Sequence, residues 1–146
     1  MAKKKSRPGP RPKLTAPTPP PAPPPPDADQ AAFLAPANSA RASAGLPPLQ
    51  PDPALAGTAS AWASSMAQSG VLSHGDFAGR IAAARPGVAA AENIAEGPAD
   101  AAGAVALWLS DPPHRDNLLG DYNRGGVGRA VAGDGRVFWC LDLCRA

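Results

Sequence analysis

The distribution of proline divides this 146-residue chain into two parts that cannot fold in the same way. Eleven of the twenty prolines lie within residues 1–26, together with six basic residues and no acidic residue. Such a segment buries too little apolar surface to fold, and the run Pro23–Pro26 favours an extended polyproline II conformation. We therefore predict a disordered, basic, proline-rich tail or linker at residues 1–26 and one folded domain at residues 27–146.

The two parts also differ in charge, which limits the partners that the chain can have. Residues 27–146 contain eight arginines and no lysine against twelve acidic residues, so the predicted domain is mildly acidic. The basic residues of the tail are not interleaved with aromatic residues, so they offer no surface on which bases could stack. We expect no nucleic-acid partner, whereas the charge of the tail is compatible with an anionic cell-envelope surface.

Signals for export or membrane insertion are missing from the sequence. The basic start at Lys3–Lys5 is not followed by the apolar stretch of roughly 7–15 residues that a signal peptide contains. No apolar run approaches the ~18 residues that a membrane-spanning helix needs. We therefore expect neither a signal peptide nor a transmembrane segment within this chain.

Helical patterns account for the first half of the predicted domain. A helix is expected over residues 29–44, with Pro36 either kinking it or delaying its start. A second helix is expected from Pro53, with Asp52 as its N-cap and Gly70 just beyond its end. Its core-facing stripe consists of apolar residues at helical spacing, namely Leu55, Ala59, Trp62 and Met66.

The second half combines short helices with a hairpin. Further short helices are expected at residues 77–84, 99–110 and 114–119. The rest of the stretch 71–98 has no regular pattern. Val127–Ala132 and Arg136–Leu143 flank the glycine-containing turn Gly133–Gly135, which predicts an antiparallel hairpin. Helices followed by a late antiparallel sheet place the domain in the α+β class.

Two cysteines, Cys140 and Cys144, lie in the last predicted strand. Four residues apart on a strand, they share a face and are about 13 Å from each other. A disulfide needs Cα atoms within about 7 Å, so bonding them would require the chain to turn back. Two free thiols are at least as compatible with the pattern, and the cysteines do not identify the compartment.

Histidine and glutamate are each used only twice, as His74 and His114 and as Glu92 and Glu96. His74, His114 and Glu92 would be a suitable donor set for Zn²⁺ and would leave a coordination position open. Their spacing follows no local metal motif, however. Glu92 could instead hydrogen-bond the histidines in a metal-free network that holds the loops in place. The sequence leaves both interpretations open.

Neighbouring polar residues are interpreted as structural. Ser73 adjoins His74, but adjacent side chains rarely point at each other and no Gly-x-Ser-x-Gly elbow surrounds this serine. Arg41 is expected to hydrogen-bond backbone carbonyls in the core. Arg115 is expected to pair with an acid or to cap a helix end. The sequence therefore contains no convincing nucleophile.

Several segments occur together in an order that is typical of one family. They are Asn38–Arg41, Gly45–Leu49, Asp52–Leu55, Ser73-His74, Glu92–Ala95, Trp108–Leu119 and Gly126–Gly128. This pattern resembles the CAP superfamily (cysteine-rich secretory protein, antigen 5 and PR-1, also called the SCP domain) in its short bacterial form. The resemblance runs from about residue 30 to residue 143, nearly the whole predicted domain.

The resemblance implies a three-layer α-β-α sandwich with a central antiparallel sheet and a binding cleft lined by two histidines and two acids. His74, Glu92 and His114 match three members of that cleft, and Asp111 is the fourth candidate. The chain departs from the family pattern at Ala37, Pro51, Ala91 and Gly125, where a histidine, an aromatic residue, a glycine and an apolar residue are usual. These departures concern packing and loop geometry more than the cleft.

Three functions are compatible with this sequence. The first is a non-enzymatic CAP domain, extracellular or in the cell envelope, whose cleft binds a divalent metal or a small apolar ligand such as a lipid or sterol. The second is a protease-like hydrolase that uses histidine and glutamate as a general base. The third is a structural domain whose partner binds the proline-rich tail. We expect the first, because the cleft residues are present and a nucleophile is not.

Overall fold

The computed structural model describes residues 26–146, so nearly all of the predicted tail or linker at residues 1–26 lies outside the described residues. The helices are α1 (Pro26–Ser43), α2 (Pro53–Ser69), α3 (Phe77–Ala84), α4 (Ala101–Ser110) and α5 (Pro112–Leu118). The strands are β1 (Gln50–Pro51), β2 (Ala89–Glu96), β3 (Arg124–Val131) and β4 (Val137–Arg145). None of the helices formed by these residues combines the length and apolar character required to cross a membrane.

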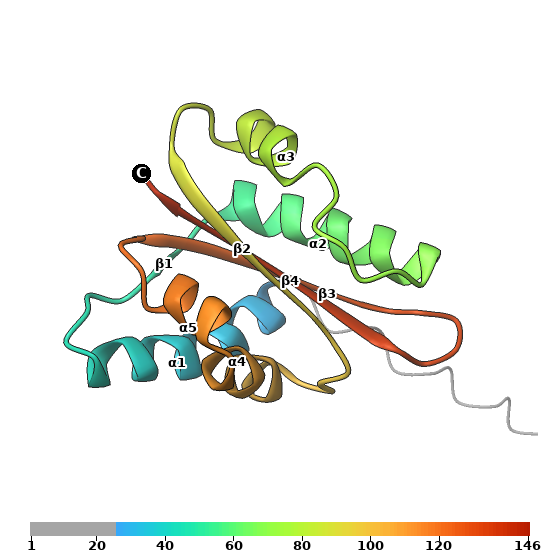
Figure 1. Cartoon of the computed structure of the whole chain (residues 1–146), viewed down its shortest axis with the longest axis horizontal. Coiled ribbons are helices and arrows are strands. Elements are labelled where there is room, and N and C mark those ends of the chain that lie inside the picture. Colours follow the sequence, from blue (N-terminus) through green and yellow to red (C-terminus); the bar gives the residue numbers. More distant parts are fainter. Residues whose placement is uncertain (1–25) are drawn as a thin grey trace, which may run out of the picture.

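The four strands form one sheet between two helical layers, which confirms the predicted α+β class and α-β-α sandwich (Figure 1). Helices α2 and α3 cover one face, and α1, α4 and α5 cover the other. The order is β1-β3-β4-β2, with β2, β4 and β3 antiparallel. The short β1 adds to β3 in parallel, so the sheet is mixed rather than wholly antiparallel.

Local signals located several elements correctly. The carboxylate of Asp52 accepts hydrogen bonds from the first two free amides of α2, and Gly70 ends that helix in the left-handed conformation at φ 69°. Helix α3 spans the predicted residues 77–84, and α4 lies within the predicted residues 99–110. The hairpin of β3 and β4 is also present, with each strand longer than predicted.

Two segments differ from the prediction. Pro36 does not delay the start of α1, because the helix begins at Pro26 and continues through the proline to Ser43. Strand β2 lies where no regular structure was predicted, since its alanine-rich sequence has little preference for a strand. Its conformation comes from pairing along its whole length with β4, from Ala89–Arg145 to Glu96–Phe138.

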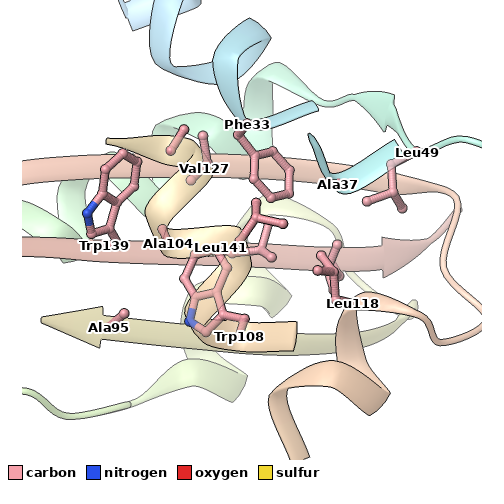
Figure 2. Packing of buried hydrophobic residues seen from close by; sticks show 13 residues of the cluster. Phe33, Ala37, Leu49, Ala95, Ala104, Trp108, Leu118, Val127, Trp139 and Leu141 are labelled. Atoms are coloured by element: carbon pink, nitrogen blue, oxygen red, sulfur yellow. The ribbon is translucent and has the colours of Figure 1, made fainter. Parts of the chain in front are cut away.

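The larger core lies between the sheet and the layer of α1, α4 and α5 (Figure 2). Trp108 and Trp139 are fully buried there, and Phe33 meets the edge of Trp108 with ring centroids 6.5 Å apart. Arg41 is also buried and donates hydrogen bonds to the carbonyls of Pro47, Leu118, Gly120 and Tyr122, which is the role expected for it. These hydrogen bonds of the guanidinium link α1 to the loops that surround this core.

Helix α2 lies directly on β3 because two glycines remove the side chains between them. A Cβ at Gly126 would collide with the backbone of Ala56, and a Cβ at Gly128 would collide with the backbone of Ser60. Ala59, Ala63 and Met66 of the helix pack against Ile94, Phe138 and Cys140 of the sheet. Trp62, predicted in the core-facing stripe, is only half buried and lies at the margin of this layer.

Candidate binding site around Glu92

Glu92 is the centre of a polar cluster on the face of the sheet that α2 and α3 cover. Its side chain is 1% exposed, and its Oε1 lies 2.7 Å from Nδ1 of His74. The second oxygen, Oε2, accepts a hydrogen bond from the guanidinium of Arg80 and lies 3.3 Å from Sγ of Cys140. A buried carboxylate needs such partners, because burial of an unpaired charge is costly.

The loop that carries His74 is held from several sides. The backbone carbonyl of His74 accepts a hydrogen bond of 2.8 Å from Nη1 of Arg80, and the carbonyl of Ser73 accepts one of 2.8 Å from Nε1 of Trp62. Gly75 has φ +52° and lies against the Trp62 ring, where a Cβ would collide. The imidazole of His74 nevertheless remains 55% exposed, so the cluster presents one oriented ring to solvent.

Arg80 and Trp62 belong to the site although sequence reasoning assigned neither to it. The guanidinium of Arg80 stacks 4.2 Å from the centre of the Trp62 ring while it binds Glu92. Arg80 is the only charged residue in α3, and that isolation was an available signal. The helical spacing of Trp62 carried no comparable signal, since it matches a core stripe.

Cys140 and Asp142 complete the buried side of the cluster. Asp142 is directly opposite Glu92 in the β2–β4 register, and both are buried. Burial, followed by the contact with Glu92, raises the pKa of Asp142 to about 8. Burial likewise raises the pKa of the Cys140 thiol well above its ordinary value. An aspartate within the apolar strand Val137–Arg145 was the sequence signal for this site.

The two cysteines are free thiols, both buried in β4. Cys140 contacts Glu92, whereas Cys144 packs with Leu55 and Ile81. The extended strand keeps the thiols apart, as its regular pairing with β2 and β3 requires.

His114 lies in the other helical layer. Its Nδ1 is 2.6 Å from Oδ2 of Asp111, three residues earlier, and both side chains are partly exposed. Its carbonyl accepts a hydrogen bond of 2.9 Å from Asn93, the residue that follows Glu92 on β2 and faces the opposite side of the sheet. The structure therefore brings His74 to Glu92 and His114 to Asp111. In the part of the chain that is described, no hydrogen bond or ion pair joins these two pairs.

This arrangement bears on the predicted zinc ligands. His74, Glu92 and His114 do not bring three donor atoms within 4.8 Å of one another in residues 26–146, whereas Glu92, Cys140 and Asp142 do. As arranged here, the predicted three do not form a common coordination sphere. A zinc ion held by His74, His114 and Glu92 therefore stays a prediction.

An apolar pocket of about 360 Å³ opens elsewhere on the same domain. Its lining includes Gln30, Pro51, Pro53, Ala56, Gly57 and Val127. The amide of Gln30 forms part of the wall and hydrogen-bonds the carbonyl of Gly125 and the amide of Val127, at 2.9 and 2.8 Å. The pocket thus lies between the starts of α1 and α2 and the edge of β3, separate from the Glu92 cluster.

Solved structures share this fold. An outer surface protein from Borrelia burgdorferi is 20% identical, with a TM-score of 0.73, covering 81% of this chain and 92% of that one. An extracellular protein from Bacillus anthracis that contains an SCP domain is 29% identical, with a TM-score of 0.66, covering 75% of this chain. A cysteine-rich secretory protein from Staphylococcus aureus is 19% identical, with a TM-score of 0.64 and 81% coverage.

This chain corresponds to only 38% of the Bacillus protein and 40% of the Staphylococcus protein. A comparison with curated proteins finds no match. A comparison with protein families matches residues 34–143 to the cysteine-rich secretory protein family. The matched range contains both histidine pairs, the second part of α1 and all of the sheet except the last two residues of β4, so this chain belongs to the cysteine-rich secretory protein (CAP) family.

Proposed function

We propose that this protein is a non-enzymatic binding module that works outside the cytoplasm, and that the surface around His74 is its recognition site. The observation that carries this proposal is the half-exposed imidazole held on the buried carboxylate of Glu92. A ring fixed in this way can bind a metal ion or a polar group of a ligand without losing conformational freedom first. Family membership supports a location in the extracellular space or the cell envelope.

The absence of an evident nucleophile favours binding over hydrolysis. Glu92 orients His74 as a catalytic carboxylate would orient a general base. Among the described residues, however, no serine, threonine or cysteine side chain hydrogen-bonds His74. The hydroxyl of the adjacent Ser73 accepts a hydrogen bond of 3.0 Å from the Gly75 amide and so stabilises the loop. Hydrolysis by a protease-like mechanism is the alternative, and peptide turnover that disappears in His74→Ala would support it.

The metal version of the proposal is tested by titrating Zn²⁺ into the protein and following both histidines by NMR. Binding by the His74, His114 and Glu92 set should shift the imidazole signals of both histidines together. The His74–Glu92 and His114–Asp111 pairs would then have to rearrange. Unchanged signals from both rings would rule this version out.

The pocket of about 360 Å³ supports a second version of the proposal, in which a small apolar ligand such as a lipid or sterol binds in this pocket instead of a metal ion at the histidines. Gly57 lines this pocket, and a Cβ added there meets no atom of the described residues within 4 Å. Gly57→Leu should therefore fill the pocket and weaken the binding of a fluorescent fatty acid at least tenfold. Ser65→Leu, on the exposed side of the same helix, is the matched control. Equal binding by wild type and both variants would contradict a role for the pocket.

The basic residues of the segment 1–26 supply a means of attachment to an anionic envelope surface. Removal of that segment should abolish salt-sensitive binding of the protein to vesicles that contain anionic lipid. Binding that persists without the segment would assign attachment to the domain.

A further inference from the structure

Three buried side chains on two neighbouring strands point donor atoms at one place. Glu92, Cys140 and Asp142 each contribute one atom to a group in which all atoms lie within 4.8 Å of one another. Sγ of Cys140 is 3.3 Å from Oε2 of Glu92 and 3.8 Å from Oδ1 of Asp142. In a tetrahedral zinc site, sulfur and oxygen ligands lie about 3.5 Å apart, given metal bonds of roughly 2.3 and 2.0 Å. The two sulfur-to-oxygen distances of Cys140 lie on either side of that value.

A second observation distinguishes this group from an ordinary acidic cluster. The side chain of Asp142 is fully buried, yet its Oδ2 has no hydrogen-bond partner among residues 26–146. An unpartnered buried carboxyl oxygen is costly, and native proteins usually satisfy such atoms with a proton donor, a water molecule or an ion. Here the orphaned oxygen belongs to a residue that already contributes to the donor group.

We propose that Glu92, Cys140 and Asp142 form a binding site for a thiophilic divalent cation of the Zn²⁺ class. The thiol excludes magnesium and calcium as preferred occupants, because these ions select oxygen ligands. Three protein ligands leave the fourth position of a tetrahedral site for water or for a bound ligand. The inference does not depend on the proposed function, since neither Cys140 nor Asp142 belongs to the histidine set considered there.

The charges of the group are compatible with this occupant. Binding of M²⁺ requires that the thiol of Cys140 lose its proton and that both carboxyl groups be ionised. Three anionic ligands would then be balanced by the cation together with the guanidinium of Arg80, which stays on Glu92. His74, bound to the other oxygen of Glu92, would hold that carboxylate in position. In the exchange, the cation enters and the displaced protons pass to solvent, with no change in oxidation state.

The test uses Co²⁺ as a spectroscopic substitute for Zn²⁺ in the full chain. Ligation by a thiolate produces a near-ultraviolet sulfur-to-cobalt charge-transfer band, which a site made of histidines and carboxylates cannot produce. We expect this band at one equivalent of Co²⁺ in the wild type, its loss in Cys140→Ala, and at least tenfold weaker binding in Asp142→Asn. Cys144→Ala is the matched control, because Cys144 is the other buried thiol of β4.

Several results would overturn the proposal. These are a wild type without the band, a band that persists in Cys140→Ala, or a band lost in Cys144→Ala. A different outcome would be that cobalt binds without producing the band and that this binding is lost in His114→Ala. That result would assign the metal to the histidine set instead. If Cys140→Ala does not fold, X-ray absorption on the zinc-loaded wild type decides. One sulfur neighbour at about 2.3 Å supports the site, and a shell without sulfur overturns it.

Discussion

Glu92 on β2 and Asp142 on β4 are direct cross-strand partners, and both carboxyl groups are buried. Two ionised carboxylates in such positions would repel each other strongly. The fold accommodates them because the side chains of Arg80 and His74 bind the carboxyl group of Glu92, whereas burial raises the pKa of Asp142 to about 8. The raised pKa therefore lets Asp142 keep its proton near neutral pH beside the carboxyl group of Glu92.

The raised pKa of Asp142 makes the stability of the domain depend on pH. An unfolded aspartate loses its proton near 3.8, and the folded one near 8, so between these values the folded state holds a proton that the unfolded state lacks. The contribution of Asp142 to the free energy of unfolding should be fully present below the lower value and lost as the pH rises through the upper one.

Urea unfolding from about pH 5 to about pH 8 should therefore show falling stability in the wild type and a flatter profile in Asp142→Asn. The amide cannot ionise and has nearly the same shape. Asp134→Asn, in the exposed turn of the hairpin, serves as the control. Identical slopes for wild type and Asp142→Asn would contradict the assignment of the proton.

Glu92→Ala should destabilise the domain by about 3–5 kcal/mol, the range for removing one partner of a buried ion pair. The variant leaves the guanidinium of Arg80 without its carboxylate, and the Nε of this guanidinium already lacks a hydrogen-bond partner within the described part of the chain. The loop of His74 should also become sensitive to proteolysis. Glu96→Ala is the matched control, since Glu96 lies four residues along the same strand and is partly exposed, and its effect should stay within about 0.5 kcal/mol.

Arg41→Ala should destabilise the domain by roughly 3 kcal/mol or more, because it leaves one buried and three partly buried carbonyls without this donor. Arg41→Lys should recover only part of this loss, since an ammonium cannot span the four carbonyls that the planar guanidinium reaches. Chemical denaturation measures both effects. Arg115→Ala, at an exposed position of α5, should be close to neutral. Equal stability of the Arg41 and Arg115 variants would contradict this account.

Gly128→Ala should be strongly disruptive for a single-methyl change, with a cost of about 3 kcal/mol or more. The added Cβ would meet the backbone of Ser60 rather than a movable side chain, so α2 would have to shift away from β3. Gly133→Ala adds the same group where nothing lies within 4 Å. Thermal unfolding should separate the two variants clearly, and similar melting temperatures would refute direct contact between α2 and β3.

Elements with local signals were predicted well. Asp52 and Gly70 delimit α2 through contacts within a few residues, and the glycines near residue 133 permit the hairpin. Strand β2 had no such signal, because its alanines favour a helix and only the pairing with β4 makes it a strand. Trp62 has the spacing of a core residue, yet it is only partly buried, and Arg80 of α3 stacks on its ring.

The candidate site likewise has some members that the sequence indicates and others that only the tertiary structure reveals. The sequence indicated His74, Glu92 and His114, because histidine and glutamate are rare in this chain. The family pattern added Asp111. Only the tertiary structure assigned His74 to Glu92 and His114 to Asp111, and only it brought Arg80, Cys140 and Asp142 to the same carboxylate. Caps, turns and helical periodicity depend on neighbours along the chain, so local sequence specifies them. The protonation and partners of a buried carboxylate depend on strand register and burial, which arise only when distant segments pack together.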